Sequence, residues 1–320
     1  MIGYGKWGIN HVKTASSLLG PENIIACDPD PKSRDLVKAV NPAIQFTTRY
    51  EDILENPSFN AVVIATPAET HFWIAEKCLE HRKHVLIEKP ITLYSSEARH
   101  LVDLAAKYKL KLMVGHVLLH HPAILKIKSM MEVGMIGKLQ YIYSNRLNLG
   151  TIRSEENILW SFAPHDISII QFLTGNSPLT TDAHGGDFIQ DDIEDTTITY
   201  LTYPNNVHAH IFVSWLHPFK EHRLVVIGEE GMVVFEDSVK ADKLKFYKKG
   251  FKKINGFLEK FDEDFQVISF GDTPALTAEH RHFYESVLNN TQPRTDGEHA
   301  FEVLQILECA QEGLKKHVTE

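Results

Sequence analysis

Three glycines at the start of the chain constrain its fold more than any other feature. They form a GxGxxG motif, Gly3-Tyr4-Gly5-Lys6-Trp7-Gly8. In a dinucleotide-binding fold the first glycine makes a tight turn, the second lets backbone approach a pyrophosphate, and the third lets a helix pack on a strand. The helix N-terminus then offers free N–H groups to the phosphates. The motif predicts a nucleotide site, with an ordinary glycine turn as the alternative.

An acidic residue strengthens the nucleotide interpretation. Asp28 ends the next apolar run, Asn23–Asp28. An acid placed about 20 residues after the glycines hydrogen-bonds the adenosine ribose in NAD enzymes. Its charge would repel a 2′-phosphate, so the sequence favours NAD over NADP, although Lys32 and Arg34 lie nearby.

The strand that should precede the glycine turn is unusually short in this sequence. Only Met1 and Ile2 stand before Gly3, whereas strands usually have about 5–6 residues. We therefore expect either a native start upstream of Met1 or a very short central strand, and favour the former.

The first third of the chain alternates between strand-like and helical segments. Helical patterns cover Glu69–His81 and Ser95–Tyr108, and buried-strand runs cover Asn60–Pro67, His84–Pro90 and Lys111–His116. Alternation of this kind predicts βαβ units and a doubly wound parallel sheet, the Rossmann fold. We place this NAD-binding domain at residues 1–116.

Longer strands without intervening helices dominate residues 117–320, our second predicted domain. An alternating strand covers Val207–Trp215, and Arg223–Glu236 has the pattern of a hairpin. Further elements are two strands and two helices, at Lys243–Lys248, Phe265–Phe270, Pro274–Leu288 and Glu298–Lys316. The pattern predicts an α/β domain with a large, mainly antiparallel open sheet.

Composition excludes several classes of protein. A net charge of -9 argues against a general nucleic-acid binder. Three cysteines without a CxxC pair are typical of a reduced, intracellular protein. No apolar run approaches the roughly 20 residues of a membrane span. We expect a cytoplasmic protein without nucleic-acid or membrane partners. The neighbours His120 and His121 lack further ligands at metal-site spacing, so we predict no metal.

Two polar groups carry the expected chemistry. Glu88-Lys89-Pro90 follows a predicted strand, at the edge where doubly wound sheets bind ligands. A lysine whose pKa is lowered to about 7–8 can accept the proton of an alcohol; a lysine at the solvent end of a strand is the alternative. Downstream, His165 and Asp166 open a predicted helix, Asp166–Thr174. This histidine suits a proton acceptor or a hydroxyl contact, and a capping His-Asp pair is the simpler interpretation.

Taken in order, these motifs resemble the glucose–fructose oxidoreductase and inositol dehydrogenase family. The likeness rests on GxGxxG, Ala65-Thr66-Pro67 with His71, the EKP motif, Gly115-His116, and the histidine on a helix. It covers nearly the whole chain. It implies a homodimer or homotetramer formed through the second domain's sheet, with Lys89 as acid/base and His165 on the reacting hydroxyl. It also implies cofactor contacts from the glycine motif with Lys6 and Trp7, and from Asp28, Thr66, Pro67, His71, Glu88 and Lys89.

Two positions depart from the family's pattern. Ser161 stands where members often have an aspartate, and Ala163 where they often have a glycine. A carboxylate-assisted proton relay is therefore in doubt. Asp166 could compensate in part, but adjacent helical residues point in different directions.

The substrate interpretation rests on residues that approach His165. Arginine suits phosphate oxygens, and asparagine suits sugar hydroxyls or an acetamido group. The stretch looks most like members that oxidise nucleotide sugars, including UDP-N-acetylglucosamine 3-dehydrogenases. An ordinary polar loop, an inositol or free-sugar dehydrogenase, and a non-catalytic NAD-binding regulator remain alternatives. The expected substrate contacts are Lys89, His116, Arg146, Asn148, Arg153, Asn157, His165 and Asp166.

Overall fold

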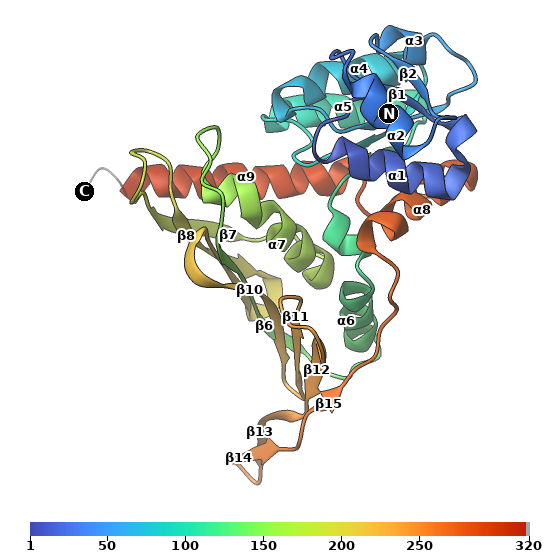
Figure 1. Cartoon of the computed structure of the whole chain (residues 1–320). Coiled ribbons are helices and arrows are strands. Elements are labelled where there is room, and N and C mark those ends of the chain that lie inside the picture. Colours follow the sequence, from blue (N-terminus) through green and yellow to red (C-terminus); the bar gives the residue numbers. More distant parts are fainter. Residues whose placement is uncertain (318–320) are drawn as a thin grey trace. The chain divides into compact units, whose positions relative to one another are not determined.

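The computed structural model describes residues 1–317, which divide into two compact units (Figure 1). The first, here called the Rossmann unit, comprises Met1–His120 and Thr273–Leu304. The second, here called the sheet unit, comprises His121–Asp272 and the described residues from Gln305 onward.

The Rossmann unit contains a parallel sheet, as predicted. Its strands are β1 (Ile25–Cys27), β2 (Gln45–Thr47), β3 (Ala61–Ile64), β4 (His84–Ile87) and β5 (Leu112–Val114). β1 pairs with β2, and β4 pairs with β3 and β5. Ile2 joins the two groups through parallel bridges to Cys27 and Ile64, so the short segment before the glycine turn occupies the central strand position. The buried Val and Ile residues of these strands explain their continuous apolar runs.

Helices flank this sheet. They are α1 (Gly8–Leu19), α2 (Ser33–Val40), α3 (Glu51–Leu54), α4 (His71–Glu80), α5 (Ser95–Tyr108) and α8 (Ala275–Leu288). The bounds of α5 match the prediction. Helix α4 begins later than predicted because Ala68–Thr70 forms a 3-10 turn, one of three here with Pro21–Asn23 and Val117–His120. From the far end of the sequence, α8 packs on α1 and places Phe283 in the core.

The sheet unit is built on an eight-stranded sheet, with strand order β15-β12-β11-β10-β6-β9-β8-β7. Its strands are β6 (Leu139–Leu149), β7 (Thr180–Gly186), β8 (Thr196–Tyr203), β9 (Val207–Ser214), β10 (Leu216–Gly228), β11 (Met232–Glu236), β12 (Leu244–Tyr247) and β15 (Gln266–Val267). All neighbours are antiparallel except β6 and β9, and the predicted hairpin is the β10–β11 pair. The prediction of a strand over Phe265–Phe270 was too long, since only β15 forms there.

Helices α6 (Pro122–Glu132) and α7 (Ile158–Thr174) belong to the sheet unit, and α7 lies along one face of the sheet (Figure 1). A separate hairpin of β13 (Lys249–Ile254) and β14 (Phe257–Asp262) was not predicted. Helix α9 (Gly297–His317) begins in the Rossmann unit and ends in the sheet unit. None of the helices within residues 1–317 combines the length and apolarity that a membrane crossing requires.

The predicted start of the helix that carries His165 was wrong. We expected it at Asp166, but α7 begins at Ile158, and His165 lies inside it directly after Pro164. The side chain of Asn157 caps the helix by accepting the N–H of Trp160 at 3.2 Å. Burial of Ile158 and Leu159 holds the first turn in place, and this packing outweighs the helix-breaking tendency of proline.

Candidate active site

The three glycines of the first motif have different roles. Gly3 has a φ of +91°, and a Cβ there would lie 2.5 Å from the carbonyl oxygen of Ala65. A Cβ on Gly8 would lie 2.2 Å from the carbonyl oxygen of Gly3. Around Gly5, by contrast, no heavy atom within residues 1–317 lies within 4 Å of the Cβ position, apart from Gly5 itself and its two chain neighbours. Gly3 and Gly8 therefore serve the packing of the turn, while Gly5 leaves open backbone that a pyrophosphate can approach.

Asp28 stands directly beside this turn. It follows β1, and its Oδ2 accepts the backbone N–H of Tyr4 at 2.9 Å. Its Oδ1 accepts the N–H of Asp30 at 3.0 Å. These bonds fix a carboxylate next to the glycine motif, as a ribose-binding acid requires.

His71 ties together the loops that follow β3 and β4. Its Nδ1 lies 2.7 Å from the carbonyl oxygen of Pro90, and its Nε2 lies 2.9 Å from that of Thr66. The ring is buried, and this burial lowers its pKa. Both ring nitrogens therefore face backbone oxygens, so His71 holds Thr66 and the EKP segment in place within this unit.

The EKP segment sits at the carboxyl end of β4. The Lys89–Pro90 peptide bond is cis. Glu88 Oε2 accepts the backbone N–H of Lys89 at 3.2 Å, and Glu88 Oε1 accepts the indole N–H of Trp7. Trp7, in the glycine motif, is thus bound to the residue before the candidate base.

His116, like Lys89, is a candidate substrate contact within the Rossmann unit. It is buried, and its ring packs edge-on against that of His299 with centroids 5.6 Å apart. Its Nδ1 has no hydrogen-bond partner among residues 1–317. Burial, then His299 and the nearby Lys89 charge, keep the pKa of His116 well below its usual value. A neutral ring with a spare nitrogen suits a contact to a substrate hydroxyl.

The sheet unit holds the remaining candidates, and two of them bind each other. Arg146 on β6 donates to Asp166 on α7 through Nε (2.8 Å) and Nη2 (3.0 Å). Asp166 therefore turns toward β6, whereas His165 is only half-buried on the same helix. Ser161, where relatives often have an aspartate, lies one turn before His165 on the same helical face.

The other three polar candidates differ in how many hydrogen bonds or ion pairs they make within the sheet unit. Asn157 caps α7, and its amide nitrogen also donates to Gln311 at 2.9 Å. Arg153 is half-exposed and pairs with Glu156 at 2.5 Å. Asn148 has a buried Oδ1 with no hydrogen-bond partner in the described chain. Asn157 thus has a structural role, while Arg153 and Asn148 retain groups for a ligand.

Sequence reasoning missed two buried histidines next to this site. The Nε2 of His11 lies 2.7 Å from Glu88 Oε1, and its Nδ1 lies 2.7 Å from the Nε2 of His280. A polar histidine on the apolar face of α1 was the available signal. His280, 269 residues away along the chain, gave none.

Known proteins resemble this chain over most of its length. Residues 1–116 match the description "Oxidoreductase family, NAD-binding Rossmann fold", and residues 124–234 match "GFO/IDH/MocA C-terminal domain". The UDP-N-acetylglucosamine 3-dehydrogenase of Acidithiobacillus ferrooxidans is 28% identical over 241 residues, covering 74% of this chain and 73% of the relative. The scyllo-inositol 2-dehydrogenase (NAD(+)) of Bacillus subtilis is 25% identical over 245 residues, covering 73% and 72%.

Solved structures share the fold. The structure of UDP-N-acetylglucosamine 3-dehydrogenase from Acidithiobacillus ferrooxidans superposes with a TM-score of 0.84 at 23% identity. The superposition covers 98% of this chain and 96% of the other. The Rossmann domain and the large mixed sheet therefore follow a known two-domain architecture.

Proposed function

This chain belongs to the GFO/IDH/MocA family of NAD-binding oxidoreductases, and on that premise we propose that it oxidises a hydroxyl of a nucleotide sugar to a ketone. The proposed substrate is of the UDP-N-acetylglucosamine type, oxidised at C3. The observation that carries the chemistry is the EKP lysine, held at the carboxyl end of β4 beside the glycine turn. Similarity to a UDP-N-acetylglucosamine 3-dehydrogenase supports the substrate class.

The residues around the glycine turn fit a dinucleotide. Gly5 leaves its Cβ position open, and Asp28 presents a carboxylate beside it. Asp28 favours NAD over NADP because a 2′-phosphate would meet its negative charge. Bound NAD supplies the acceptor for the hydride. The groups that we propose to bind NAD are the backbone of the glycine motif, Asp28, and the loop at Thr66 and Pro67.

Lys89 is the proposed acid/base. In alcohol oxidation its neutral amine takes the proton of the substrate hydroxyl, which must leave as the carbon gives up hydride. Its backbone N–H donates to Glu88 Oε2 at 3.2 Å, which helps to hold the backbone from which its side chain extends. We assign His165 to the same hydroxyl as an orienting contact, and His116 to a neighbouring one.

The diphosphate is assigned to Arg153 ahead of Arg146. The guanidinium of Arg146 already donates two hydrogen bonds to the carboxylate of Asp166. This carboxylate neutralises much of the charge of the guanidinium. Arg153 is half-exposed, and its ion pair with Glu156 is a surface pair that costs little to exchange. Asn148, with its unpartnered oxygen, is the candidate for the acetamido group or a sugar hydroxyl.

A direct test follows NADH absorbance after adding NAD with UDP-N-acetylglucosamine, and in parallel with myo-inositol. A ketone trap is included because alcohol oxidation is often unfavourable. We expect NADH only with the nucleotide sugar, and a raised KM for it in Arg153→Met. NADH with myo-inositol alone would contradict the diphosphate assignment and favour the second candidate, an inositol dehydrogenase, which the resemblance to scyllo-inositol 2-dehydrogenase supports.

We further propose that the chain forms a homodimer or homotetramer through the open face of the eight-stranded sheet. α7 covers one face. The opposite face of the sheet carries several aromatic side chains. On it Tyr143 stacks on His210 with ring centroids 5.3 Å apart, and Tyr200 is exposed. Exposed aromatic surface of this kind is typical of interfaces. Light scattering of the wild type and of Tyr200→Glu tests it, and a monomeric wild type would contradict it.

A further inference from the structure

The β13–β14 hairpin forms a two-stranded sheet of its own, separate from the eight-stranded sheet (Figure 1). Its register runs from the Lys249–Asp262 pair to the Ile254–Phe257 pair. The two residues between the strands, 255 and 256, have φ values of 51° and 89°, as the tight turn of a two-residue hairpin requires. A lone two-stranded hairpin is at best marginally stable in water. This hairpin is therefore a segment that gains stability from a partner.

The end of the hairpin, residues 251–258, is here called the hairpin tip, and it is both apolar and basic. Its large apolar side chains are exposed, namely Phe251, Ile254, Phe257 and Leu258. Lys252 and Lys253 are exposed as well, and the tip contains no acidic residue. Nearer the base a lysine pairs with an acid, as Lys249 does with Asp262 at 2.6 Å. The tip thus presents apolar surface together with a net positive charge.

The connection between β7 and β8 has the complementary character. Residues 187–193, here called the acidic loop, contain three aspartates and no basic residue. All three aspartates are exposed, namely Asp187, Asp191 and Asp192. Phe188 and Ile189 are exposed beside them, Phe188 to 73%. Asp187 accepts the backbone N–H of Asp192 at 3.0 Å, which holds the shape of the loop. The loop thus presents apolar surface together with a net negative charge.

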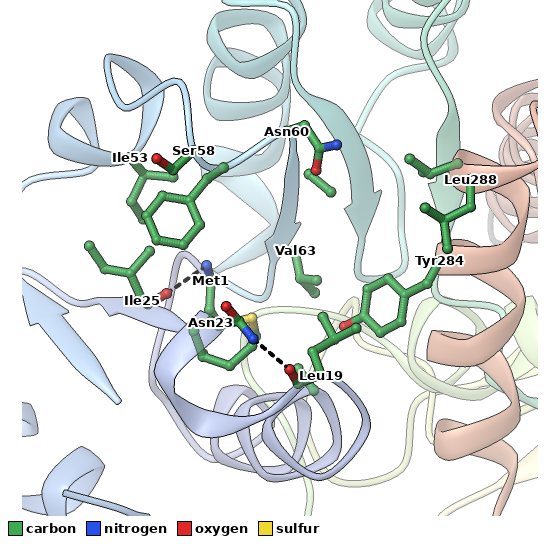
Figure 2. A pocket seen from close by; sticks show the side chains of 15 residues that line it. Met1, Leu19, Asn23, Ile25, Ile53, Ser58, Asn60, Val63, Tyr284 and Leu288 are labelled. Atoms are coloured by element: carbon green, nitrogen blue, oxygen red, sulfur yellow. Dashed lines mark hydrogen bonds between the residues drawn. The ribbon is translucent and has the colours of Figure 1, made fainter. Parts of the chain in front are cut away.

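Exposed apolar side chains of the Rossmann unit have a different setting. Leu19 and Leu288 are exposed, but they line a cavity of about 300 Å³ together with the buried Met1 and Ile25 (Figure 2). Their exposure therefore accompanies a hollow in the surface of that unit. The hairpin instead extends away from the large sheet of its own unit (Figure 1). Exposed apolar groups that cluster on such a projection mark a surface for association.

The hairpin tip and the acidic loop belong to opposite edges of the large sheet. The hairpin connects β12 to β15 at one edge, and the loop connects β7 to β8 at the other. β12 and β8 are five strand spacings apart in the sheet order, which is roughly 24 Å at about 4.8 Å per spacing. Because the hairpin also extends away from the sheet, the two surfaces of one chain do not meet. Each can be covered by the matching surface of another copy.

We propose that the hairpin tip of one copy docks on the acidic loop of a second copy. The lysines of the tip lie against the aspartates of the loop, and the exposed apolar side chains of both surfaces become buried. Opposite charges select and orient the two surfaces, and burial of apolar area supplies the main driving force. In a two-fold symmetric pair each copy gives one tip and receives one, so the contact forms twice. This contact goes beyond the open-face interface proposed above, because neither surface belongs to the open face of the sheet.

An exchange of charges tests the contact. The tip variant, Lys253→Glu with Asn255→Asp, makes the tip acidic and keeps a residue suited to the turn. The loop variant, Asp191→Lys with Asp192→Lys, makes the loop basic. A third chain combines both variants, so that its charges are opposite again with the signs exchanged. Circular dichroism checks that each chain is folded.

Analytical ultracentrifugation over a range of concentrations gives the dissociation constant of the oligomer. We expect the tip variant and the loop variant each to raise it about 10-fold or more, because both copies of the contact change from attraction to repulsion. The combined chain should associate much like the wild type. The control, Lys126→Glu with Asn205→Asp, makes the same charge change at exposed positions elsewhere in the sheet unit and should have no effect.

Two results of this experiment would overturn the proposal. One is a combined chain that associates no more tightly than the tip variant alone. The other is a monomeric wild type, which would leave the tip to a different partner. Failure of the open-face interface looks different, because Tyr200→Glu would then associate like the wild type while the tip variant still dissociates. The measurement needs no substrate, so its outcome is independent of the proposed oxidation.

Site-specific cross-linking shows which surfaces meet. Phe257→Cys on the tip and Phe188→Cys in the loop are made in a Cys309→Ser background, because Cys309 is an exposed free cysteine. A short bis-maleimide then joins cysteines that lie close together. We expect a covalent dimer when the two variants are mixed, and little from either variant alone. An equal yield of covalent dimer from Phe257→Cys alone would overturn the pairing of tip with loop.

Discussion

Arg146 donates two hydrogen bonds to the carboxylate of Asp166, one of 2.8 Å from Nε to Oδ2 and one of 3.0 Å from Nη2 to Oδ1. Asp166 is 1% exposed, and Ser144 donates a third bond to it at 2.6 Å. The pair joins β6 to α7, the helix that carries His165. The sequence predicts Arg146 as a substrate contact. In the structure Arg146 instead helps to hold α7, the helix that carries His165, against β6.

This ion pair makes a prediction about stability. Arg146→Met should lower the free energy of unfolding by about 3–5 kcal/mol, because it leaves a buried carboxylate without its partner. Arg153→Met is the matched control, since its surface pair with Glu156 should be worth no more than about 1 kcal/mol. Urea unfolding followed by circular dichroism measures both. Equal midpoints for the two variants would contradict a structural role for Arg146.

Lys89→Met should abolish turnover while leaving NAD binding nearly intact. The side chain keeps its length but loses the amine, so the reduction in kcat should reach about 100-fold to 10,000-fold, the range for a lost general base. Steady-state NADH production gives kcat, and tryptophan fluorescence gives NAD affinity. Full activity in this variant would remove the lysine from the mechanism.

Asp28→Ser should weaken selection against NADP. Loss of the carboxylate removes a ribose hydrogen bond and the repulsion of a 2′-phosphate, so the ratio of NAD to NADP affinity should fall about 10-fold, equivalent to about 1.4 kcal/mol. Asp30→Ser, a nearby exposed position, is the control and should leave the ratio unchanged. Calorimetric titration with both cofactors checks it. If the ratio of NAD to NADP affinity is the same in Asp28→Ser as in the wild type, another residue must bind the adenosine ribose.

Acid should destabilise the Rossmann unit through its buried histidines. Burial is the main cause that lowers the pKa of His120 to about 2, of His280 to about 3 and of His299 to about 4. Each binds its proton more readily when unfolded, so stability is complete above the ordinary pKa of about 6.5 and falls as pH drops below it.

The pH effect can be measured from melting temperatures between pH 7.5 and pH 5. At pH 5 each such histidine should cost about 2 kcal/mol. His280→Gln should reduce the slope. The control variant is His81→Gln, which replaces an exposed histidine. A flat profile would show that these rings titrate normally.

Local patterns predicted most secondary structure. Ser95–Tyr108 is a helix with the predicted ends, because its apolar periodicity lies within the segment itself. The β10–β11 hairpin likewise follows from two apolar runs around a glycine turn. The start of α7 did not follow, because Pro164 suggests a break that burial of Ile158 and Leu159 overrides. The β13–β14 hairpin is largely exposed, so it lacked the alternating apolar pattern that marks a half-buried strand.

What the sequence by itself determined is the chemistry available: a glycine turn, an acid for a ribose, a lysine after a buried strand, and the family to which these motifs belong. Each depends on spacing along the chain, and a short segment sets its own backbone geometry. What only the tertiary structure decided is which side chains are already engaged. Arg146 forms an ion pair with Asp166. His11 forms a hydrogen bond with His280, which lies 269 residues away in the sequence. Pairings of this kind arise from packing of distant elements, and local sequence carries no record of the partner.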